Sequence, residues 1–139
     1  MNKLRVLFVC THNSARSQMA EGMLRAWAGD DFEVASAGTE QTFVRLEAID
    51  VMAEIGIDIG GQQSKSLEPF LDEEIDWLIT VCDQARESCP TLPGVEQQAH
   101  WSIDDPVAAS QTDEDPLTPF RHAREELAIG VRRFIEEHR

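Results

Sequence analysis

The stretch LRVLFVCTHNSARSQMAEG (4–22) predicts a β-strand, a short loop and the start of a helix. Residues 4–10 are apolar and rich in branched side chains, the pattern of a strand covered on both faces. Small and polar residues follow, and apolar side chains then recur at helical spacing, which predicts a helix over 16–28 that ends near Gly29. This strand–loop–helix order is the unit from which parallel sheets are built.

The rest of the chain repeats this alternation of strands and helices. We expect further strands at 32–38, 76–82 and 98–103. A helix is expected through Ala48–Ala53, closed by Gly56, followed by a short helix at 66–74 and an exposed acidic loop at 104–117. A last helix is expected to begin at Thr118, whose hydroxyl caps it before Pro119, and to run to the C-terminus. The sequence therefore predicts one α/β domain over 1–139, a three-layer α/β/α arrangement around a four-stranded parallel sheet.

Composition limits the classes of partner. The 26 acidic and 12 basic residues give a formal net charge of −14, which argues against nucleic-acid binding. An anion site in this chain must act locally, within a screening length of about 8–10 Å. No stretch approaches the roughly 20 apolar residues of a membrane helix, and no signal segment precedes the first strand. We expect a soluble cytoplasmic monomer without membrane partners.

The three cysteines lie at positions 10, 82 and 89. An odd number of cysteines in a chain without a secretion signal argues against a fixed disulfide framework. Two alternatives remain open from the residues alone: inert buried thiols, or free thiols that do redox chemistry. No cysteine and histidine spacing predicts a zinc site. We expect neither a metal nor a bound cofactor.

Reactive side chains follow the predicted strands. Cys10 and Cys82 end two of them, and Asp104 and Asp105 follow a third. Because ligands of open α/β sheets bind beyond the carboxyl ends of the strands, we expect these groups to meet at one edge of the sheet.

The loop between Cys10 and Ser17 has the features of an oxyanion site. Backbone N–H groups at the start of a helix lack partners and carry positive dipole charge, and small residues let the backbone curl around a tetrahedral anion. Arg16 adds a planar fork for two oxygens and, with the helix end, favours a Cys10 thiolate that Ser17 stabilises by a hydrogen bond. The loop residues are Thr11, His12, Asn13, Ser14, Ala15 and Arg16, with His12 shaping the loop rather than acting as a base.

Cys10-x5-Arg16-Ser17 resembles the phosphate loop of the low-molecular-weight protein tyrosine phosphatases. The longer CTHNSARSQMAEG (10–22) is similar to the thioredoxin-coupled arsenate reductases built on that fold. The similarity extends to SAG (36–38), TVCDQARESCP (80–90) and HWSIDDP (100–106), and so covers nearly the whole chain.

The resemblance implies a relay of three thiols. Cys10 attacks arsenate while Asp105, with Asp104 as the weaker candidate, protonates the leaving oxygen. Cys82 then attacks the Cys10 sulfur, which releases arsenite and leaves a Cys10–Cys82 disulfide. Cys89 converts this bridge to Cys82–Cys89. The polar segment 83–88 is expected to loop out, so that reduced thioredoxin can supply the electrons.

The resemblance also implies a cation position beside the loop. Family members that respond to potassium hold the ion with oxygen ligands at the positions of Asn13, Glu21 and Ser36. Lys65 stands where an aspartate is expected. An ammonium cannot ligate a cation, so we expect Lys65 to occupy the place of the ion and donate hydrogen bonds to Glu21 and neighbouring oxygens.

Two other functions remain open at this point. The chain is a tyrosine phosphatase with incidental cysteines, or it is a non-catalytic thiol redox sensor or arsenite-binding protein. Cys82 and Cys89 weigh against the first, because phosphate ester hydrolysis needs one thiol. Arg16 in an oxyanion loop weighs against the second.

Overall fold

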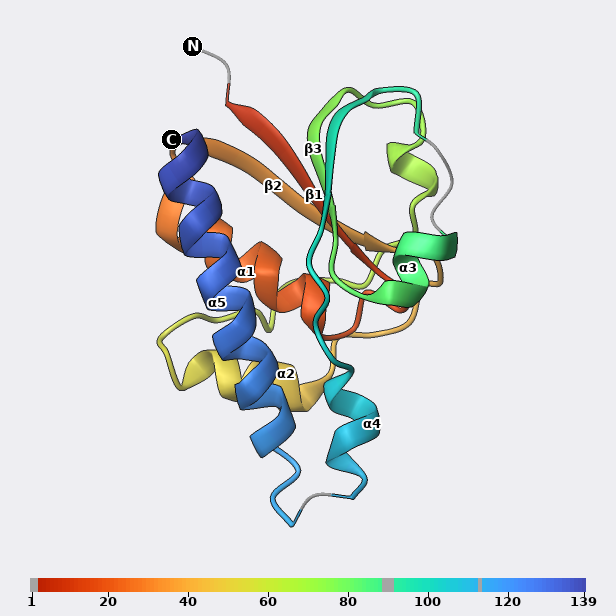
Figure 1. The fold of residues 1–139 in the computed structure, drawn as a ribbon. Helices are drawn as coiled ribbons and strands as arrows, with labels where there is room; N and C mark the ends of the chain where they lie inside the picture. Colours follow the sequence, from red (N-terminus) through yellow and green to blue (C-terminus); the bar gives the residue numbers. More distant parts are fainter. Residues whose placement is uncertain (1–2, 89–91, 113) are drawn as a thin grey trace.

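The computed structural model describes residues 3–88, 92–112 and 114–139, in which parallel strands alternate with helices (Figure 1). In chain order the elements are β1 (Leu4–Cys10), α1 (Arg16–Ala28), β2 (Phe32–Gly38), α2 (Leu46–Ala53), the 3-10 turn η1 (Glu68–Phe70), β3 (Ile75–Thr80), α3 (Asp83–Ser88), β4 (Val95–His100), α4 (Pro106–Ser110) and α5 (Thr118–His138). The predicted α/β class and parallel four-stranded sheet are confirmed. Within the described ranges, no helix combines the length and the apolar character that a membrane span requires.

The strands lie in the order β2-β1-β3-β4, so the first strand is central. Cys10 at the end of β1 pairs with Gly38 at the end of β2. One step back along β1, Val9 is in register with Thr80 of β3, which in turn pairs with His100 of β4. The carboxyl ends of all four strands therefore meet at one edge, as the alternation of strands and helices predicts.

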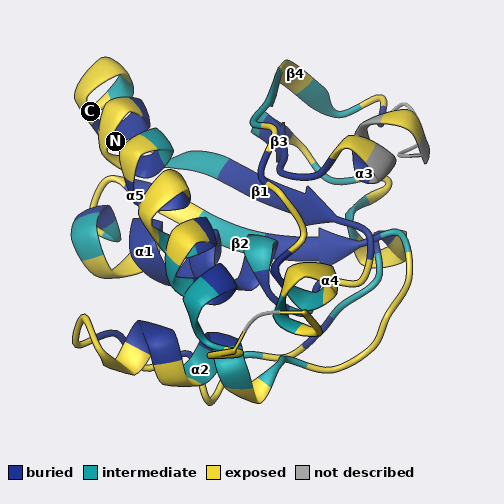
Figure 2. Cartoon of the chain, turned by 60° about the horizontal axis from the view of Figure 1, so that its bottom comes forward, coloured by how far each residue is buried: buried dark blue, intermediate teal, exposed yellow. Residues whose placement is uncertain are grey.

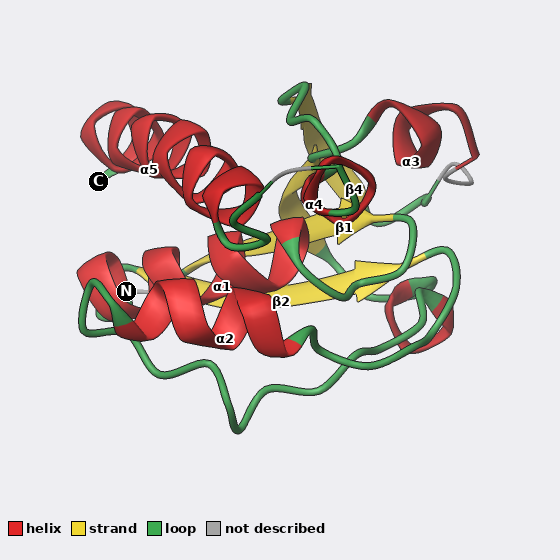
Figure 3. Cartoon of the chain, turned by 90° about the horizontal axis from the view of Figure 1, so that it is seen from below, coloured by secondary structure: helices red, strands yellow, loops and turns green. Residues whose placement is uncertain are grey.

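Helices cover the sheet from both sides. α1 packs against β1, β2 and α5, and α3 contacts β1 and β3. Figures 1 and 3 show α1 and α5 together on one side of the strands and α3 on the other. Figure 2 shows β1 buried along most of its length, whereas β4 contains only intermediate and exposed residues. The core between the layers contains the fully buried side chains of Phe8, Met19, Leu24, Ile79, Phe120 and Leu127.

A cluster of charged side chains joins α2 to α5. Glu54, directly after α2, accepts hydrogen bonds from the guanidinium groups of Arg121 and Arg124. Arg121 also pairs with Asp115, in the turn before α5. The hydrogen bonds from Arg121, and then from Arg124, lower the pKa of Glu54 to about 2. The cluster fixes the start of the longest helix against α2.

Two strand boundaries differ from the sequence prediction. β4 covers Val95–His100 and not 98–103, because this edge strand exposes polar side chains, which apolar patterning does not detect. β3 ends at Thr80, and the backbone N–H of Val81 bonds the carbonyl of Val9. Cys82 therefore lies beyond the strand, directly before α3.

The structure differs from the helix predictions at four places. The segment 104–117 contains α4, because Asp105 accepts a hydrogen bond from the N–H of Val107 and Pro106 opens the helix. Thr118 does not cap α5; the preceding turn is closed by the carboxylate of Asp115, so Thr118 is already helical. Residues 83–88 form α3, a helix that the sequence did not predict, and 66–74 contains only η1.

Candidate active site

The nucleophile candidate lies at the end of β1, beneath the start of α1. Cys10 is 3% exposed, and its Sγ lies 2.8 Å from the Oγ of Ser17, in the first turn of α1. The backbone N–H groups of this first turn face the loop, and the helix dipole adds positive charge there. Ser17 and the start of α1 therefore lie directly at the Cys10 sulfur.

Asn13 holds the loop in shape. Its φ is +50°, the left-handed conformation in which asparagine is favoured over most residues. The buried side chain donates hydrogen bonds to the hydroxyl oxygens of Ser17 (2.8 Å) and Ser36 (2.9 Å). It accepts hydrogen bonds from the amide of Gln18 (2.9 Å) and the backbone N–H of Lys65 (2.7 Å). One side chain thus joins the loop to α1, β2 and the segment before η1.

The chain after β2 forms one wall of the loop. The N–H groups of Glu40 and Arg45 donate hydrogen bonds to the carbonyls of Thr11 and Ser14, each at 2.8 Å. Gly38 packs so closely against the loop that a Cβ there would lie 2.9 Å from the nitrogen of Asn13 and closer still to two carbonyl oxygens. A glycine at the end of β2 is therefore needed for the close approach of the two segments.

A pocket of about 260 Å³ opens above Cys10. Arg16 projects into it, with Nη1 donating to the carbonyl of Ile103 (2.8 Å) and Nη2 lying 4.0 Å from the Oδ1 of Asp105. Asp105 lines the pocket, half exposed, whereas Asp104 does not. Of the two adjacent carboxylates, Asp105 is thus the one beside the predicted anion site.

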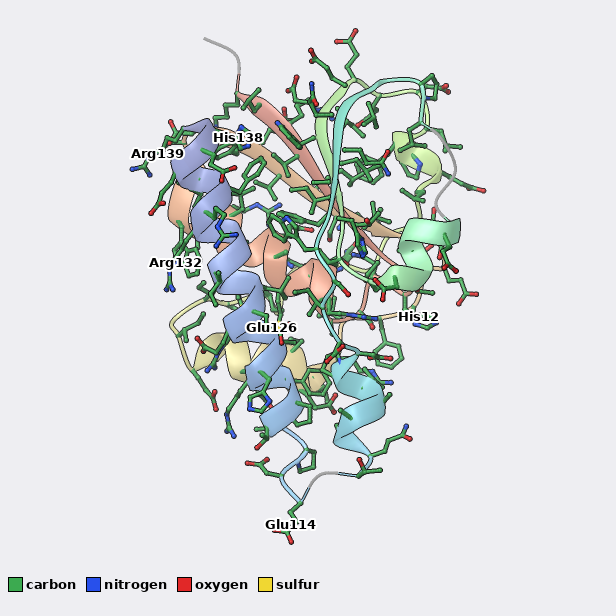
Figure 4. All side chains as sticks on the ribbon, viewed as in Figure 1. His12, Glu114, Glu126, Arg132, His138 and Arg139 are labelled. Atoms are coloured by element: carbon green, nitrogen blue, oxygen red, sulfur yellow. The ribbon has the colours of Figure 1, made fainter. Side chains whose placement is uncertain are left out.

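His12, Ser14 and Ala15 also line this pocket. His12 is half exposed, and its Nε2 lies 3.1 Å from a carboxylate oxygen of Glu40. Its carbonyl accepts hydrogen bonds from the hydroxyls of Thr42 and Ser64. Figure 4 labels His12, which lies between α3 and α4 at the edge of the sheet. These contacts fit the loop-shaping role expected of His12.

The second cysteine lies close to the loop. Cys82 is buried and free, and its Sγ lies 3.3 Å from the Oγ1 of Thr11, the residue that follows Cys10. The backbone N–H of Ala85 also donates a hydrogen bond to the Cys82 sulfur at 3.3 Å. The structure therefore brings Cys10 and Cys82 into one neighbourhood. Cys89 lies outside the described residues.

A histidine network supports the segment that carries Cys82. His100 contacts the hydroxyl of Thr80 through Nδ1 (2.7 Å) and the carboxylate of Asp83 through Nε2 (2.8 Å). Ser102 donates to the same Asp83 oxygen. Asp83 is the first residue of α3, so the network joins the start of this helix to β3 and β4. The sequence alone assigns no chemistry to His100, because its partners Thr80 and Asp83 lie 20 and 17 residues earlier in the chain.

The predicted cation position contains an ion-pair cluster. The buried carboxylate of Glu21 accepts a hydrogen bond from Ser36 and pairs with Arg25 at 2.7 Å. The Nζ of Lys65 lies 3.6 Å from Glu21 and donates to the carbonyl of Gln63 at 2.9 Å. Among the residues that the structure describes, no group of three or more His, Cys, Asp or Glu side chains suits a metal ion.

Four further residues line the pocket and were not predicted from the sequence: Thr42, Phe43, Arg45 and Val107. They belong to no recognisable sequence motif. The first three could have been found from the topology, because the chain that leaves β2 lies at the same edge of the sheet as Cys10. Val107 could have been found from its position in the first helical turn after Asp105.

A family model described as low molecular weight phosphotyrosine protein phosphatase matches residues 5–138. The chain belongs to this family. The resemblance inferred from Cys10-x5-Arg16-Ser17 is thus confirmed at the level of the family.

Within the family, the chain is similar to arsenate reductases. It is 41% identical over 136 residues to the arsenate reductase of Halalkalibacterium halodurans, a match that covers 98% of both chains. A solved arsenate reductase in its phosphate-binding state shares 34% identity with a TM-score of 0.82, over 98% of this chain and 99% of that one. The thioredoxin-dependent arsenate reductase of Corynebacterium glutamicum shares 25% identity with a TM-score of 0.73, over 97% of this chain and 61% of that one.

Proposed function

We propose that this protein reduces arsenate to arsenite by passing two electrons from its own thiols, and that reduced thioredoxin regenerates it. The observation that carries the proposal is the pair of free, buried cysteines at one loop: Cys10 beneath the oxyanion pocket and Cys82 beside Thr11. The similarity to arsenate reductases over nearly the full chain supports the choice of substrate.

In the first step, the loop N–H groups and Arg16 bind three arsenate oxygens. The Cys10 thiolate attacks arsenic, and a sulfur–arsenic bond forms as one oxygen leaves. Asp105 donates the proton that lets this oxygen depart as water, a role for which its place in the pocket beside Arg16 is suited. Ser17 stabilises the Cys10 sulfur through its hydroxyl.

In the second step, the Cys82 thiolate attacks the Cys10 sulfur. The new sulfur–sulfur bond takes the place of the sulfur–arsenic bond, whose electron pair stays on arsenic. Arsenic thereby changes from the pentavalent to the trivalent state and leaves as arsenite, while two thiols are oxidised to a Cys10–Cys82 disulfide. The N–H of Ala85 donates a hydrogen bond to the attacking Cys82 sulfur, and the hydroxyl of Thr11 lies 3.3 Å from it.

In the third step, Cys89 attacks Cys82, which frees Cys10 and leaves a Cys82–Cys89 disulfide. Thioredoxin is the proposed reductant of this bridge; the name of the similar Corynebacterium protein supports that choice. Because α3 carries the residues between the two cysteines, the exchange requires α3 to unwind or shift away from the sheet. The hydrogen bonds of His100 and Asp83 are the contacts that must break first.

Two alternatives are separable from this proposal. A phosphatase uses Cys10, Arg16 and Asp105 but leaves Cys82 without a role. A redox sensor or arsenite-binding protein uses the thiols but leaves the oxyanion pocket without a role. Only arsenate reduction uses both the pocket and the second thiol.

The test couples the protein to thioredoxin, thioredoxin reductase and NADPH. Addition of arsenate should cause NADPH oxidation and release of arsenite, and Cys10→Ser should abolish both. Cys82→Ser should abolish reduction but retain any hydrolysis of an aryl phosphate, since only the redox steps need this thiol. Aryl phosphate hydrolysis without arsenate-dependent NADPH oxidation would select the phosphatase alternative, and the absence of both would select the sensor.

A further inference from the structure

Arg45 lies at the oxyanion pocket without an anionic partner. Most of the other described arginines pair with carboxylates, among them Arg5, Arg25, Arg121, Arg124 and Arg139. Arg45 lines the same pocket as Cys10 and Arg16. Across 3–88, 92–112 and 114–139, its guanidinium forms neither an ion pair nor a hydrogen bond, and it lies over the ring of Phe43.

The position of Arg45 is set by the loop itself. Its backbone N–H donates a 2.8 Å hydrogen bond to the carbonyl of Ser14, which attaches the residue to the oxyanion loop. Its Cζ lies 5.7 Å from the centre of the Phe43 ring, within the range of a cation–π contact. Phe43 is 63% exposed and lines the pocket as well. The exposed ring of Phe43 thus positions the guanidinium of Arg45 while leaving its N–H donors available to an anion.

We propose that Arg45 is a second oxyanion-binding residue, which captures the anion at the mouth of the pocket before Arg16 and the loop bind it. Arg16 already donates a hydrogen bond to the carbonyl of Ile103 and lies 4.0 Å from Asp105. The net charge of −14 repels any anion that approaches. A cation at the mouth, within a screening length of the loop, opposes that field where the anion enters.

The proposal also bears on product release. Arsenate is an anion at neutral pH, whereas arsenous acid is neutral. A guanidinium that binds through charge therefore has a higher affinity for the anionic substrate than for the neutral product. This part rests on the proposed function, whereas anion capture itself can be tested with inorganic phosphate, which has the same tetrahedral shape and is not reduced.

The experiment titrates inorganic phosphate into the reduced protein by calorimetry, at low and high ionic strength. The variants are Arg45→Gln and Arg45→Lys. The matched control is Arg132→Gln, because Arg132 also lies over an aromatic ring, that of Trp27 at 4.8 Å, and its loss removes the same charge. Figure 4 labels Arg132 on α5, well apart from His12 of the loop.

We expect Arg45→Gln to weaken phosphate binding about tenfold, or about 1.4 kcal/mol, and to reduce its dependence on ionic strength. Arg45→Lys should retain part of the affinity, because it keeps the charge but not the planar fork. Arg132→Gln should stay within about twofold of wild type. In arsenate turnover, Arg45→Gln should raise KM with little change in kcat.

Equal losses in Arg45→Gln and Arg132→Gln would overturn the proposal, because the effect would then be that of net charge. Unchanged phosphate affinity in Arg45→Gln, or a fall in kcat with KM unchanged, would also overturn it. Melting curves check that the variants fold. If Arg45→Gln does not fold, the comparison of Arg45→Lys with wild type provides the test. Failure of the proposed function gives a different result: no arsenate turnover in wild type, with the phosphate affinities still ordered as expected.

Discussion

Replacement of Asn13 tests whether one side chain holds the oxyanion loop in shape. Its amide makes four hydrogen bonds, to Ser17, Ser36, Gln18 and the backbone of Lys65. Asn13→Gly removes all four but accepts the φ of +50° without strain. Asn13→Ala removes the same bonds and adds the cost of a left-handed conformation.

The magnitude follows from what each partner retains. Ser17, Ser36 and Gln18 keep other hydrogen bonds, whereas the N–H of Lys65 loses the acceptor that the structure gives it. Buried hydrogen bonds contribute about 0.5–1.5 kcal/mol each, and a donor left without a partner costs about 1–3 kcal/mol. We expect Asn13→Gly to lower the free energy of unfolding by about 3 kcal/mol. Asn13→Ala should lower it by about 4 kcal/mol, since the left-handed conformation adds about 1 kcal/mol.

The assay is urea unfolding followed by tryptophan fluorescence, with melting temperature as a second measure. A loss of about 3 kcal/mol corresponds to a fall of about 10 °C in a domain of this size. Arsenate turnover should fall by about 10²-fold in both variants, because the loop N–H groups lose their positions. A loss of less than about 1 kcal/mol in Asn13→Gly, or a more stable Asn13→Ala than Asn13→Gly, would refute the reasoning.

Three further substitutions test the proposed general acid Asp105, the ammonium group of Lys65, and the contact of Glu54 with α5. Asp105→Asn should slow arsenate turnover by about 10²–10⁴-fold while phosphate binding persists, and an unchanged rate would move the acid role to Asp104. The Nζ of Lys65 lies 3.6 Å from Glu21, and we expect it to take the place of a bound cation. The wild-type melting temperature should therefore not change when potassium replaces sodium at constant ionic strength, whereas Lys65→Asp should make it potassium-sensitive; a specific rise in wild type with potassium would contradict this. The pKa of Glu54 is lowered from 4.5 to about 2, so its carboxylate stabilises the fold above pH 4.5 and this contribution is lost as the pH falls through about 2. Glu54→Gln should therefore lower the melting temperature at pH 7, with a difference from wild type that shrinks below pH 4.5; a difference that does not depend on pH would exclude the charge as its cause.

The sequence predicted the loop well because its determinants are local. The strand, the small residues and the helix that contains Ser17 follow one another, so Cys10, Arg16 and Ser17 come together without any distant contact. The parallel topology then predicts that Cys82 and Asp105 reach the same edge, and the described structure brings both beside the loop.

The missed features depend on partners that are distant in sequence. Arg45 enters the pocket because its N–H bonds Ser14, far from it along the chain, and no short motif records that contact. His100 is defined by its contacts with Thr80 and Asp83, on other elements. The predicted bounds of β4 lie three residues too far along the chain, because an exposed edge strand lacks the apolar pattern of a buried one.

The most direct test of the central claim is a single-turnover experiment with Cys89→Ser. The reduced variant is incubated with excess arsenate, arsenite is counted per chain, and the disulfides are mapped by mass spectrometry of peptides. Cys10 and Cys82 together hold the two electrons needed, so we predict one arsenite per chain and a trapped Cys10–Cys82 bridge. Repeated turnover with thioredoxin, or one arsenite per chain without that bridge, would contradict the account.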